Sequence, residues 1–327
     1  MEQLSLFREF HAGIDVADSI LASRLKGIKT PEDFRVFGRS IGGKAHEIGI
    51  EREKDGEGGH RPPIVALPGF CHGNWSYIKL IEALADKGIE ISAVSPFGEE
   101  ATGPMQKPPE SWTMEDYLNP YRNYLKDKNR EVVLLGHSLG GLQAQILATQ
   151  LRSQIRGLIL INSVKPSNLC QRRYSVVSRD GAEFRPNENM KWILEELFNG
   201  EFPEDITWII DRLKLAIGSN NVIDDYGGEN GRVDPKLIGK SVLEFSGTED
   251  GGQTTGIHGN RHEMVVEEEE GFIREQRMSI TDFFLKSGNC PYGKKIDIDN
   301  GSHNSLILGK HVKEVAQGIW DNISIFE

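Results

Sequence analysis

Cysteine is scarce in this sequence of 327 residues, in which it occurs three times, as Cys71, Cys170 and Cys290. The three are widely spaced and include no Cys-x-x-Cys pair. That spacing argues against a disulfide framework and against a structural zinc site. A reducing, cytoplasmic location is therefore expected.

Basic residues are also few: 38 lysines and arginines stand against 49 acidic residues, for a net charge of −11. Such a surface repels phosphate backbones, so nucleic acid is not an expected partner. The longest apolar runs, such as 132–135 and 158–161, fall far short of the roughly 20 residues that cross a bilayer. The first residues do not resemble a secretory signal. We expect no membrane span.

Short apolar runs and amphipathic segments alternate from Ile64 onward, a pattern typical of a parallel sheet covered by helices on both faces. The expected strands are residues 64–67, 90–94, 132–135, 158–162, 242–246 and 294–298, preceded by a two-stranded hairpin over 34–52. The expected helices are residues 1–31, 75–87 (ending at Gly88), 139–152 and 304–322. Asn119-Pro120 is read as the start of a further helix, so that an earlier helix ends there.

One segment interrupts this alternation. Residues 164–240 contain two amphipathic stripes without a strand between them, which indicates either ordinary core-facing helices or a cap over a ligand site. We favour the cap. The expected organisation is a core of residues 1–163 and 241–327, with an N-terminal helical extension over 1–35 and an inserted helical cap over 164–240.

A candidate nucleophile follows the buried run 132–135. Gly136-His137-Ser138-Leu139-Gly140 has the pattern G-x-S-x-G between a strand and a helix, which places Ser138 on a sharp turn at the sheet edge. The motif alone is weak, because chance gives roughly 0.3 occurrences in a sequence with this glycine and serine content. The alternative is a glycine-rich turn that only packs a helix on a sheet. The flanking strand and helix favour a nucleophile.

Ser138 requires a base, and on this type of scaffold the acid and then the histidine follow the serine. His303 lies between the last expected strand and the last expected helix, where a base can reach the sheet edge. His311 is expected inside that helix, facing away from any loop. His258 and His262 fall in an irregular charged segment that lacks an obvious third metal ligand.

The expected acid is Asp250, in the glycine-flanked loop after the strand 242–246, with Glu249 as its rival. The backbone N–H groups of Phe70 and Leu139 are the expected oxyanion donors. Other residues are candidates for an apolar substrate pocket, although each alone is more often a core residue: His72, Trp75, Phe97, Met105, Trp192, Phe198 and Trp208.

These motifs resemble the α/β-hydrolase superfamily. The likeness rests on residues 136–141, the Pro68-Gly69-Phe70 turn, the loop 247–250 and Gly301-Ser302-His303. The stretch 71–75 is similar to that of small capped esterases and of plant methylesterases and hydroxynitrile lyases. The resemblance implies the α/β-hydrolase fold, with a mostly parallel central sheet flanked by helices and an inserted helical cap.

Three comparisons with members of this superfamily bear on the reaction. The first oxyanion loop begins Pro68-Gly69 where the family usually has His-Gly. Related dehalogenases and epoxide hydrolases use an aspartate nucleophile, so Ser138 argues against both reactions. Hydroxynitrile lyases of this family place a lysine after the catalytic histidine, and Asn304 stands there, which weakens the lyase interpretation.

The expected function is that of a serine hydrolase that cleaves a carboxylic ester through a Ser138-His303-Asp250 triad and an acyl-enzyme. It requires neither a metal nor an organic cofactor, and its partner is a small-molecule acyl substrate. Four alternatives stay open: a thioesterase, a C–C bond hydrolase, a non-hydrolytic synthase or cyclase, and a ligand receptor on the same fold. A homodimer is also left open.

Overall fold

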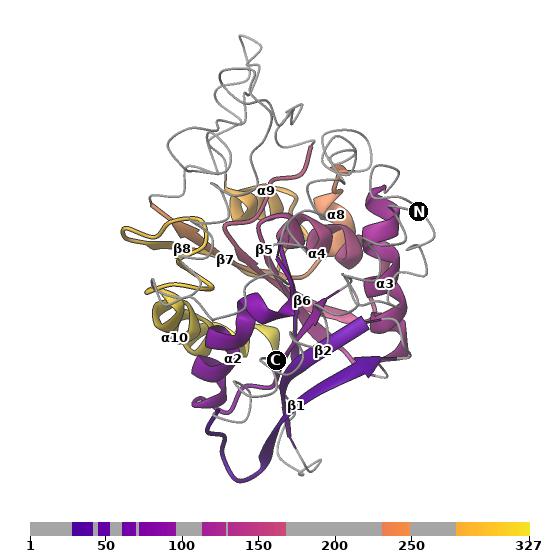
Figure 1. Cartoon of the computed structure of the whole chain (residues 1–327). Helices are drawn as coiled ribbons and strands as arrows, with labels where there is room; N and C mark the ends of the chain where they lie inside the picture. The colour runs from indigo at the N-terminus through magenta and orange to yellow at the C-terminus, as the bar shows by residue number, and fades with distance from the viewer. Residues whose placement is uncertain are drawn as a thin grey trace, which may run out of the picture.

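The computed structural model describes residues 28–41, 45–52, 61–69, 72–95, 113–128, 130–167, 231–248 and 279–327. Its centre is an eight-stranded sheet in the order β1-β2-β4-β3-β5-β6-β7-β8 (Figure 1). The strands are β1 (Phe34–Ile41), β2 (Ala45–Arg52), β3 (Ile64–Leu67), β4 (Ile91–Ser95), β5 (Val132–His137), β6 (Ile155–Ile161), β7 (Ser241–Gly247) and β8 (Gly293–Ile298). From β4 to β8 every neighbouring pair is parallel, whereas β2 pairs antiparallel with β1 and β4.

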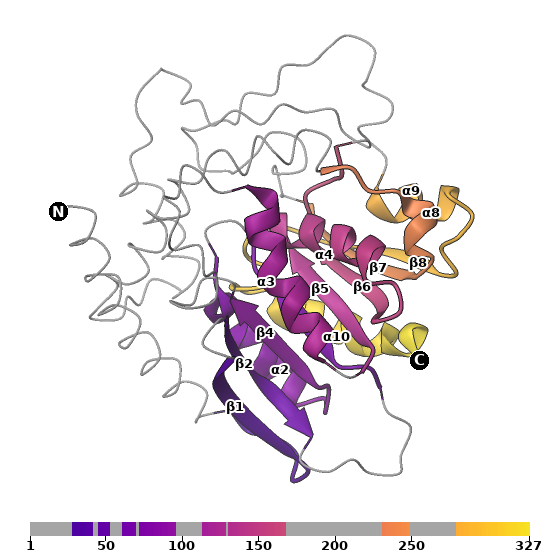
Figure 2. The same cartoon turned by 90° about the vertical axis from the view of Figure 1, so that its right-hand side faces the viewer.

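Helices cover both faces of this sheet (Figure 2). They are η1 (Asn74–Tyr77), α2 (Ile78–Ala85), α3 (Met114–Asp127), α4 (Leu139–Gln150), α8 (Pro235–Ile238), α9 (Ile280–Lys286), α10 (Val312–Asn322) and η6 (Ile323–Phe326). One core layer joins α2 and α10 to strand residues such as Ile64 and Val133. The other joins α3, α4 and α9 to Val65 and Leu134. Neighbouring strand residues thus face opposite layers, so both faces of the sheet are buried.

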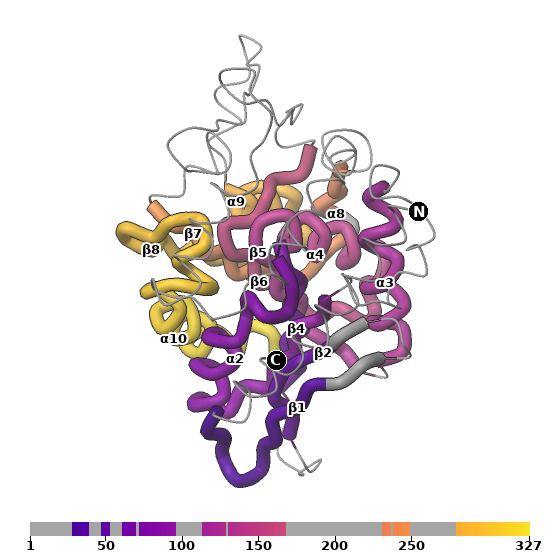
Figure 3. The backbone as a smooth tube through the Cα atoms, viewed as in Figure 1, coloured from indigo at the N-terminus to yellow at the C-terminus, as the bar shows by residue number. Residues whose placement is uncertain are grey.

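Each of these strands was predictable from the sequence. The hairpin over 34–52 is confirmed as β1 and β2, and each of the six expected parallel strands is present with its ends shifted by no more than a few residues. Gly88 is left-handed, with φ of 63°, as expected after the helix that precedes it. Helix α10, near the C-terminal end of the sequence, packs beside α2 (Figure 3). This arrangement is the α/β-hydrolase fold.

The expected helix boundary at Asn119-Pro120 is wrong. Helix α3 begins after Thr113, which forms a capping box with Asp116, and it continues through Pro120 to Asp127. Its apolar face runs unbroken past the proline and packs against the sheet. An interior proline costs a helix about 3 kcal/mol. Packing of that face offsets the cost here.

The last expected helix also begins later than predicted. Residues 304–311 form turns, and α10 starts at Val312. His311 therefore lies at the N-cap and not inside the helix. Its Nε2 is 3.0 Å from the carbonyl oxygen of Asn300, so it contacts the loop that it was expected to face away from.

Two expected segments fall outside the described residues. Residues 1–27, with most of the N-terminal helical extension, and 168–230, with most of the inserted cap, are among them. The cap therefore stays a prediction; the residues expected to form it lie in the chain between β6 and β7. Within the described part of the chain, no helix is long and apolar enough to cross a membrane.

Candidate active site

The candidate nucleophile lies on a tight turn between β5 and α4. Ser138 has φ of 53° and ψ of −122°, a conformation that side-chain-bearing residues rarely adopt. The glycines on either side are required sterically. A Cβ on Gly136 would lie 2.3 Å from the carbonyl oxygen of Gly140, and one on Gly140 would lie 2.2 Å from that of Leu67. The glycine pattern therefore reflects the close packing of β3, β5 and α4.

One expected oxyanion donor lies beside this serine, and the loop expected to carry the other begins there. Leu139 is the first residue of α4, where backbone N–H groups have no partner inside the helix and the helix dipole favours negative charge. Gly69 follows β3, and a Cβ built on it would lie 3.0 Å from the Cβ of Ser138. The loop after β3 thus passes directly over the serine. Phe70, the other expected donor, lies outside the described residues.

His303 is brought to the same edge of the sheet. It is half-buried in the loop between β8 and α10, and its ring centroid lies 4.8 Å from that of His137, the residue before Ser138. The His303 carbonyl oxygen is 2.9 Å from His137 Nε2. Residues that are 165 positions apart in sequence (138 and 303) are therefore held on adjoining loops, as the order of the strands predicted.

A row of aromatic rings continues inward from His303. The His72 ring lies edge-on to His137 at 5.3 Å and stacks on Trp75 at 5.7 Å between centroids. Burial, aided by the charge of His303, lowers the pKa of His72 to about 3. The same two causes, in the same order, hold the pKa of His137 well below its usual value. Both rings are therefore neutral at pH 7, and His137 donates its Nε2–H to the His303 carbonyl.

The loop expected to carry the acid begins next to the histidine loop. A Cβ on Gly247, the last residue of β7, would lie 2.1 Å from the carbonyl oxygen of Gly301, and Thr248 N donates to Ile298 O at 3.0 Å. Asp250 and its rival Glu249 come directly afterwards, outside the described residues. The assignment of the acid therefore stays a prediction.

The expected pocket residues are largely outside the described part of the chain. His72 and Trp75 are described, and both are buried, with Trp75 packed in the hydrophobic core. Their contact with a substrate stays a prediction. The remaining candidates lie outside the described residues: Phe97, Met105, Trp192, Phe198 and Trp208.

Sequence reasoning missed Asn162, which lies just after β6. Its Nδ2 donates to the carbonyl oxygens of Ser302 and His303 at 3.1 and 3.0 Å, and its Oδ1 accepts from Gly247 N at 2.8 Å. The only available signal was a polar residue that follows the apolar run 158–161 at the carboxyl end of a strand. Its contacts depend on the spatial convergence of three loops.

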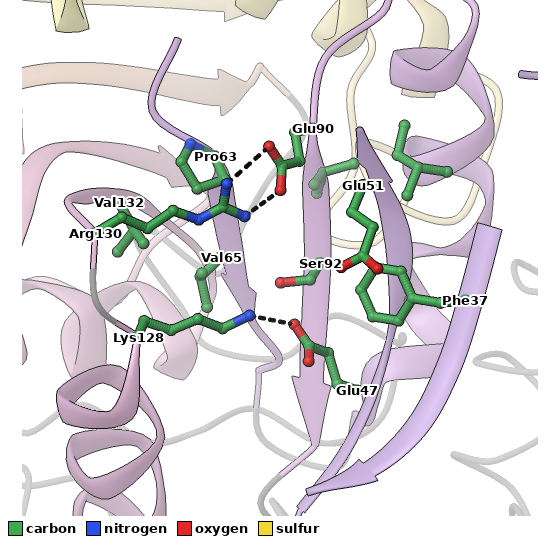
Figure 4. Close-up of a pocket in the computed structure, with 12 residues that line it drawn as sticks. Phe37, Glu47, Glu51, Pro63, Val65, Glu90, Ser92, Lys128, Arg130 and Val132 are labelled. Carbon is green, nitrogen blue, oxygen red and sulfur yellow. Dashed lines mark hydrogen bonds and ion pairs between the residues drawn. The ribbon is translucent and has the colours of Figure 1, made fainter. Parts of the chain in front are cut away.

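A hollow lies at the opposite edge of the sheet from Ser138, near the amino ends of β3, β4 and β5 (Figure 4). Arg130 forms an ion pair with Glu90 across it, and Lys128 Nζ lies 3.1 Å from the buried carboxylate of Glu47. These charged side chains pair with one another. The hollow is separated from Ser138 by the length of the strands.

Comparisons with known proteins agree with this architecture. Residues 62–215 match the family described as the alpha/beta hydrolase fold. Methylesterase 7 of Arabidopsis thaliana is 27% identical over 106 residues, which are 32% of this chain and 40% of that protein. An alpha-hydroxynitrile lyase of the same plant is 31% identical over 106 residues, with the same coverage. The chain thus aligns with about 40% of the length of these curated relatives.

A solved structure extends the likeness to nearly the whole fold. A bacterial membrane phospholipase A, described as a virulence factor, superposes with a TM-score of 0.58 at 13% identity, covering 96% of this chain and 93% of that one. At this identity the likeness concerns the fold alone. Together with the matched segment, it shows that the chain has the α/β-hydrolase fold, and over about a third of its length the chain is similar to the plant methylesterases.

Proposed function

We propose that this protein is a serine hydrolase that cleaves a carboxylic ester of a small-molecule substrate. The observation that carries the proposal is the conformation of Ser138, which stands with a positive φ between a buried strand and the first turn of a helix. A strained backbone of this kind costs about 1–3 kcal/mol and persists where the surroundings enforce it. Here it presents a hydroxyl at the sheet edge, beside a histidine loop.

In the proposed reaction, the His303 imidazole takes the proton of the Ser138 hydroxyl as its oxygen attacks the ester carbonyl carbon. The N–H groups of Leu139 and Phe70 hold the oxyanion of the tetrahedral intermediate. The intermediate expels the alcohol, which takes its proton from His303, and leaves an acyl group on Ser138. A water molecule, deprotonated by His303, then releases the acid. Asp250 orients the imidazole and stabilises its protonated form.

Two considerations favour an ester as the substrate. The hydrolase fold and relatives named methylesterases support hydrolytic chemistry. The lyase alternative is less favoured, because Asn304 follows His303 where lyases of this family have lysine. Its side chain is neutral and 1% exposed, so it offers no cation to a leaving group.

Hydrolysis of p-nitrophenyl esters of increasing acyl length, measured at pH 7.5, tests this proposal. We expect turnover by the wild type and a loss of at least about 1,000-fold in kcat for Ser138→Ala, because the covalent step is removed. Asp250→Asn is expected to lower kcat by orders of magnitude.

Glu249→Gln is the matched control for the acid and is expected to retain most activity. A larger loss in Glu249→Gln than in Asp250→Asn would reassign the acid. Wild-type turnover that survives in Ser138→Ala would refute the nucleophile.

A further inference from the structure

The chain that leaves β6 contacts the nucleophile turn, the end of β7 and the histidine loop. Val164 N donates to the carbonyl oxygen of Ser138 at 2.9 Å, and Asn162 bonds to the loops after β7 and β8. Residues 162–164 therefore lie between the nucleophile turn, the start of the acid loop and the histidine loop.

The Asn162 side chain uses both ends of its amide. It is 2% exposed, and its Nδ2 donates to two successive carbonyls of the histidine loop while its Oδ1 accepts from the last residue of β7. An amide can make this bridge because it carries a donor and an acceptor on one planar group. A carboxylate lacks the donor, and an apolar side chain would leave buried peptide groups unpaired.

The backbone of Asn162 is adapted to this task. Its φ of 42° lies in the left-handed region, which asparagine tolerates better than most residues. Its backbone N–H donates to the carbonyl oxygen of Phe245 in β7 at 2.9 Å, which extends the hydrogen bonding between β6 and β7 by one residue. The strand thus ends with a turn that aims the amide across the carboxyl edge of the sheet, toward β7 and β8.

The histidine loop is held at the residue that carries the base. The His303 carbonyl oxygen accepts from two buried donors, Asn162 Nδ2 at 3.0 Å and His137 Nε2 at 2.9 Å. With both in place, the peptide unit that carries the imidazole is fixed relative to the ends of β5 and β6. A general base must lie within hydrogen-bond reach of its proton, and a misplacement of about 1 Å can cost about 100-fold in rate.

We propose that Asn162 is a positioning residue, which sets the spacing between the general base His303 and the loop that leads to the acid by bridging the ends of β6, β7 and the histidine loop. This inference rests on the proposed function. The hydrogen bonds described for the Asn162 side chain all join it to backbone groups, namely the carbonyls of Ser302 and His303 and the N–H of Gly247. The loss of this side chain is therefore expected to lower kcat while leaving KM nearly unchanged.

Two substitutions at this position and one elsewhere test the inference. Asn162→Gly removes the bridge but tolerates the left-handed backbone. Asn162→Asp keeps the shape and the acceptor for Gly247 N–H but loses the donor to the histidine loop. The matched control is Asn322→Asp on α10, because Asn322 is also a buried asparagine whose side chain bonds to Lys294 Nζ and to the Gly318 carbonyl.

The readouts are kcat and KM for a p-nitrophenyl ester, the rate of fluorophosphonate labelling of Ser138, and the folded fraction from circular dichroism. Both Asn162 variants are expected to lose at least about 10-fold in kcat and in labelling rate, with KM within about two-fold of wild type. Asn322→Asp is expected to keep both rates. If Asn162→Gly does not fold, the kcat and labelling rate of the isosteric Asn162→Asp variant test the inference.

The inference is overturned if a folded Asn162 variant keeps kcat within two-fold of wild type, or if its loss lies in KM. A wild type that neither hydrolyses esters nor accepts the label overturns the proposed function itself. The two failures are therefore distinguishable.

Discussion

Two uncharged histidines line the buried side of the candidate site. His137 and His72 are 0% and 8% exposed, and in the part of the chain that the structure describes the Nδ1 atom of each has no hydrogen-bond partner. Their neutral state matters for His303, because a proton on either ring would place a like charge beside the imidazolium that forms during catalysis. Burial keeps these protons off at physiological pH.

This burial makes stability depend on pH. The pKa of His72 is about 3 in the folded chain and 6.5 in the unfolded chain, so the unfolded state binds the proton more readily between these values. Stability is therefore fully present above pH 6.5 and falls as the pH drops toward 3. Lowering the pH from 7.5 to 5.5 is expected to cost about 1 kcal/mol of unfolding free energy through His72 alone.

Urea unfolding of the wild type and of His72→Gln at both pH values measures this contribution. The difference between the two pH values is expected to shrink in the variant, which has no ring to protonate. An equal loss of unfolding free energy in both proteins would show that His72 does not titrate as its burial requires.

At the scale of elements, the nucleophile turn depends on close backbone contact between β3, β5 and α4. Gly140→Ala would place a methyl group 2.2 Å from the carbonyl oxygen of Leu67. Because that oxygen belongs to the backbone, the clash can be relieved only if β3 or α4 moves. We expect this substitution to lower the unfolding free energy by about 3 kcal/mol. It is also expected to lower ester turnover, because Ser138 moves with the turn.

Gly288→Ala is the matched control for this change. An alanine at position 288 would be strained by its backbone conformation, because φ is 76°, but its Cβ would meet nothing within 4 Å. We expect a loss of about 1 kcal/mol from backbone strain alone. Urea midpoints compare the two variants, and equal losses would mean that the contact between Gly140 and β3 is not tight.

The starts of two helices, α3 and α10, were predicted wrongly from sequence patterns. Pro120 signals a helix start by local preference, yet Thr113 and Asp116 supply a better cap seven residues earlier, and burial of the apolar face of α3 extends the helix through the proline. Residues 304–311 have helical periodicity, but they form turns because the histidine loop bonds to them, as Ser302 N does to Ser305 Oγ. Tertiary packing outweighed the local signal at Pro120, whereas a local side-chain hydrogen bond competes with helix formation after Ser302.

For the whole molecule, the parallel sheet was predictable because each strand is a buried apolar run between amphipathic segments. The placement of Ser138 and His303 at one edge of the sheet was predictable for the same reason, since both follow strands whose carboxyl ends share that edge. The bridge made by Asn162 was not, because it depends on which loops meet there. The pattern of residues along the chain does not show which loops come together in the fold.

The proposed reaction requires that the fold activates Ser138 as a nucleophile. Labelling with a fluorophosphonate probe, read by intact mass, measures this activation, because the probe reacts with serines that have a working base and oxyanion site. We predict that the wild type gains the mass of one probe and that Ser138→Ala gains none. An unlabelled wild type, or equal labelling of both proteins, would contradict the account.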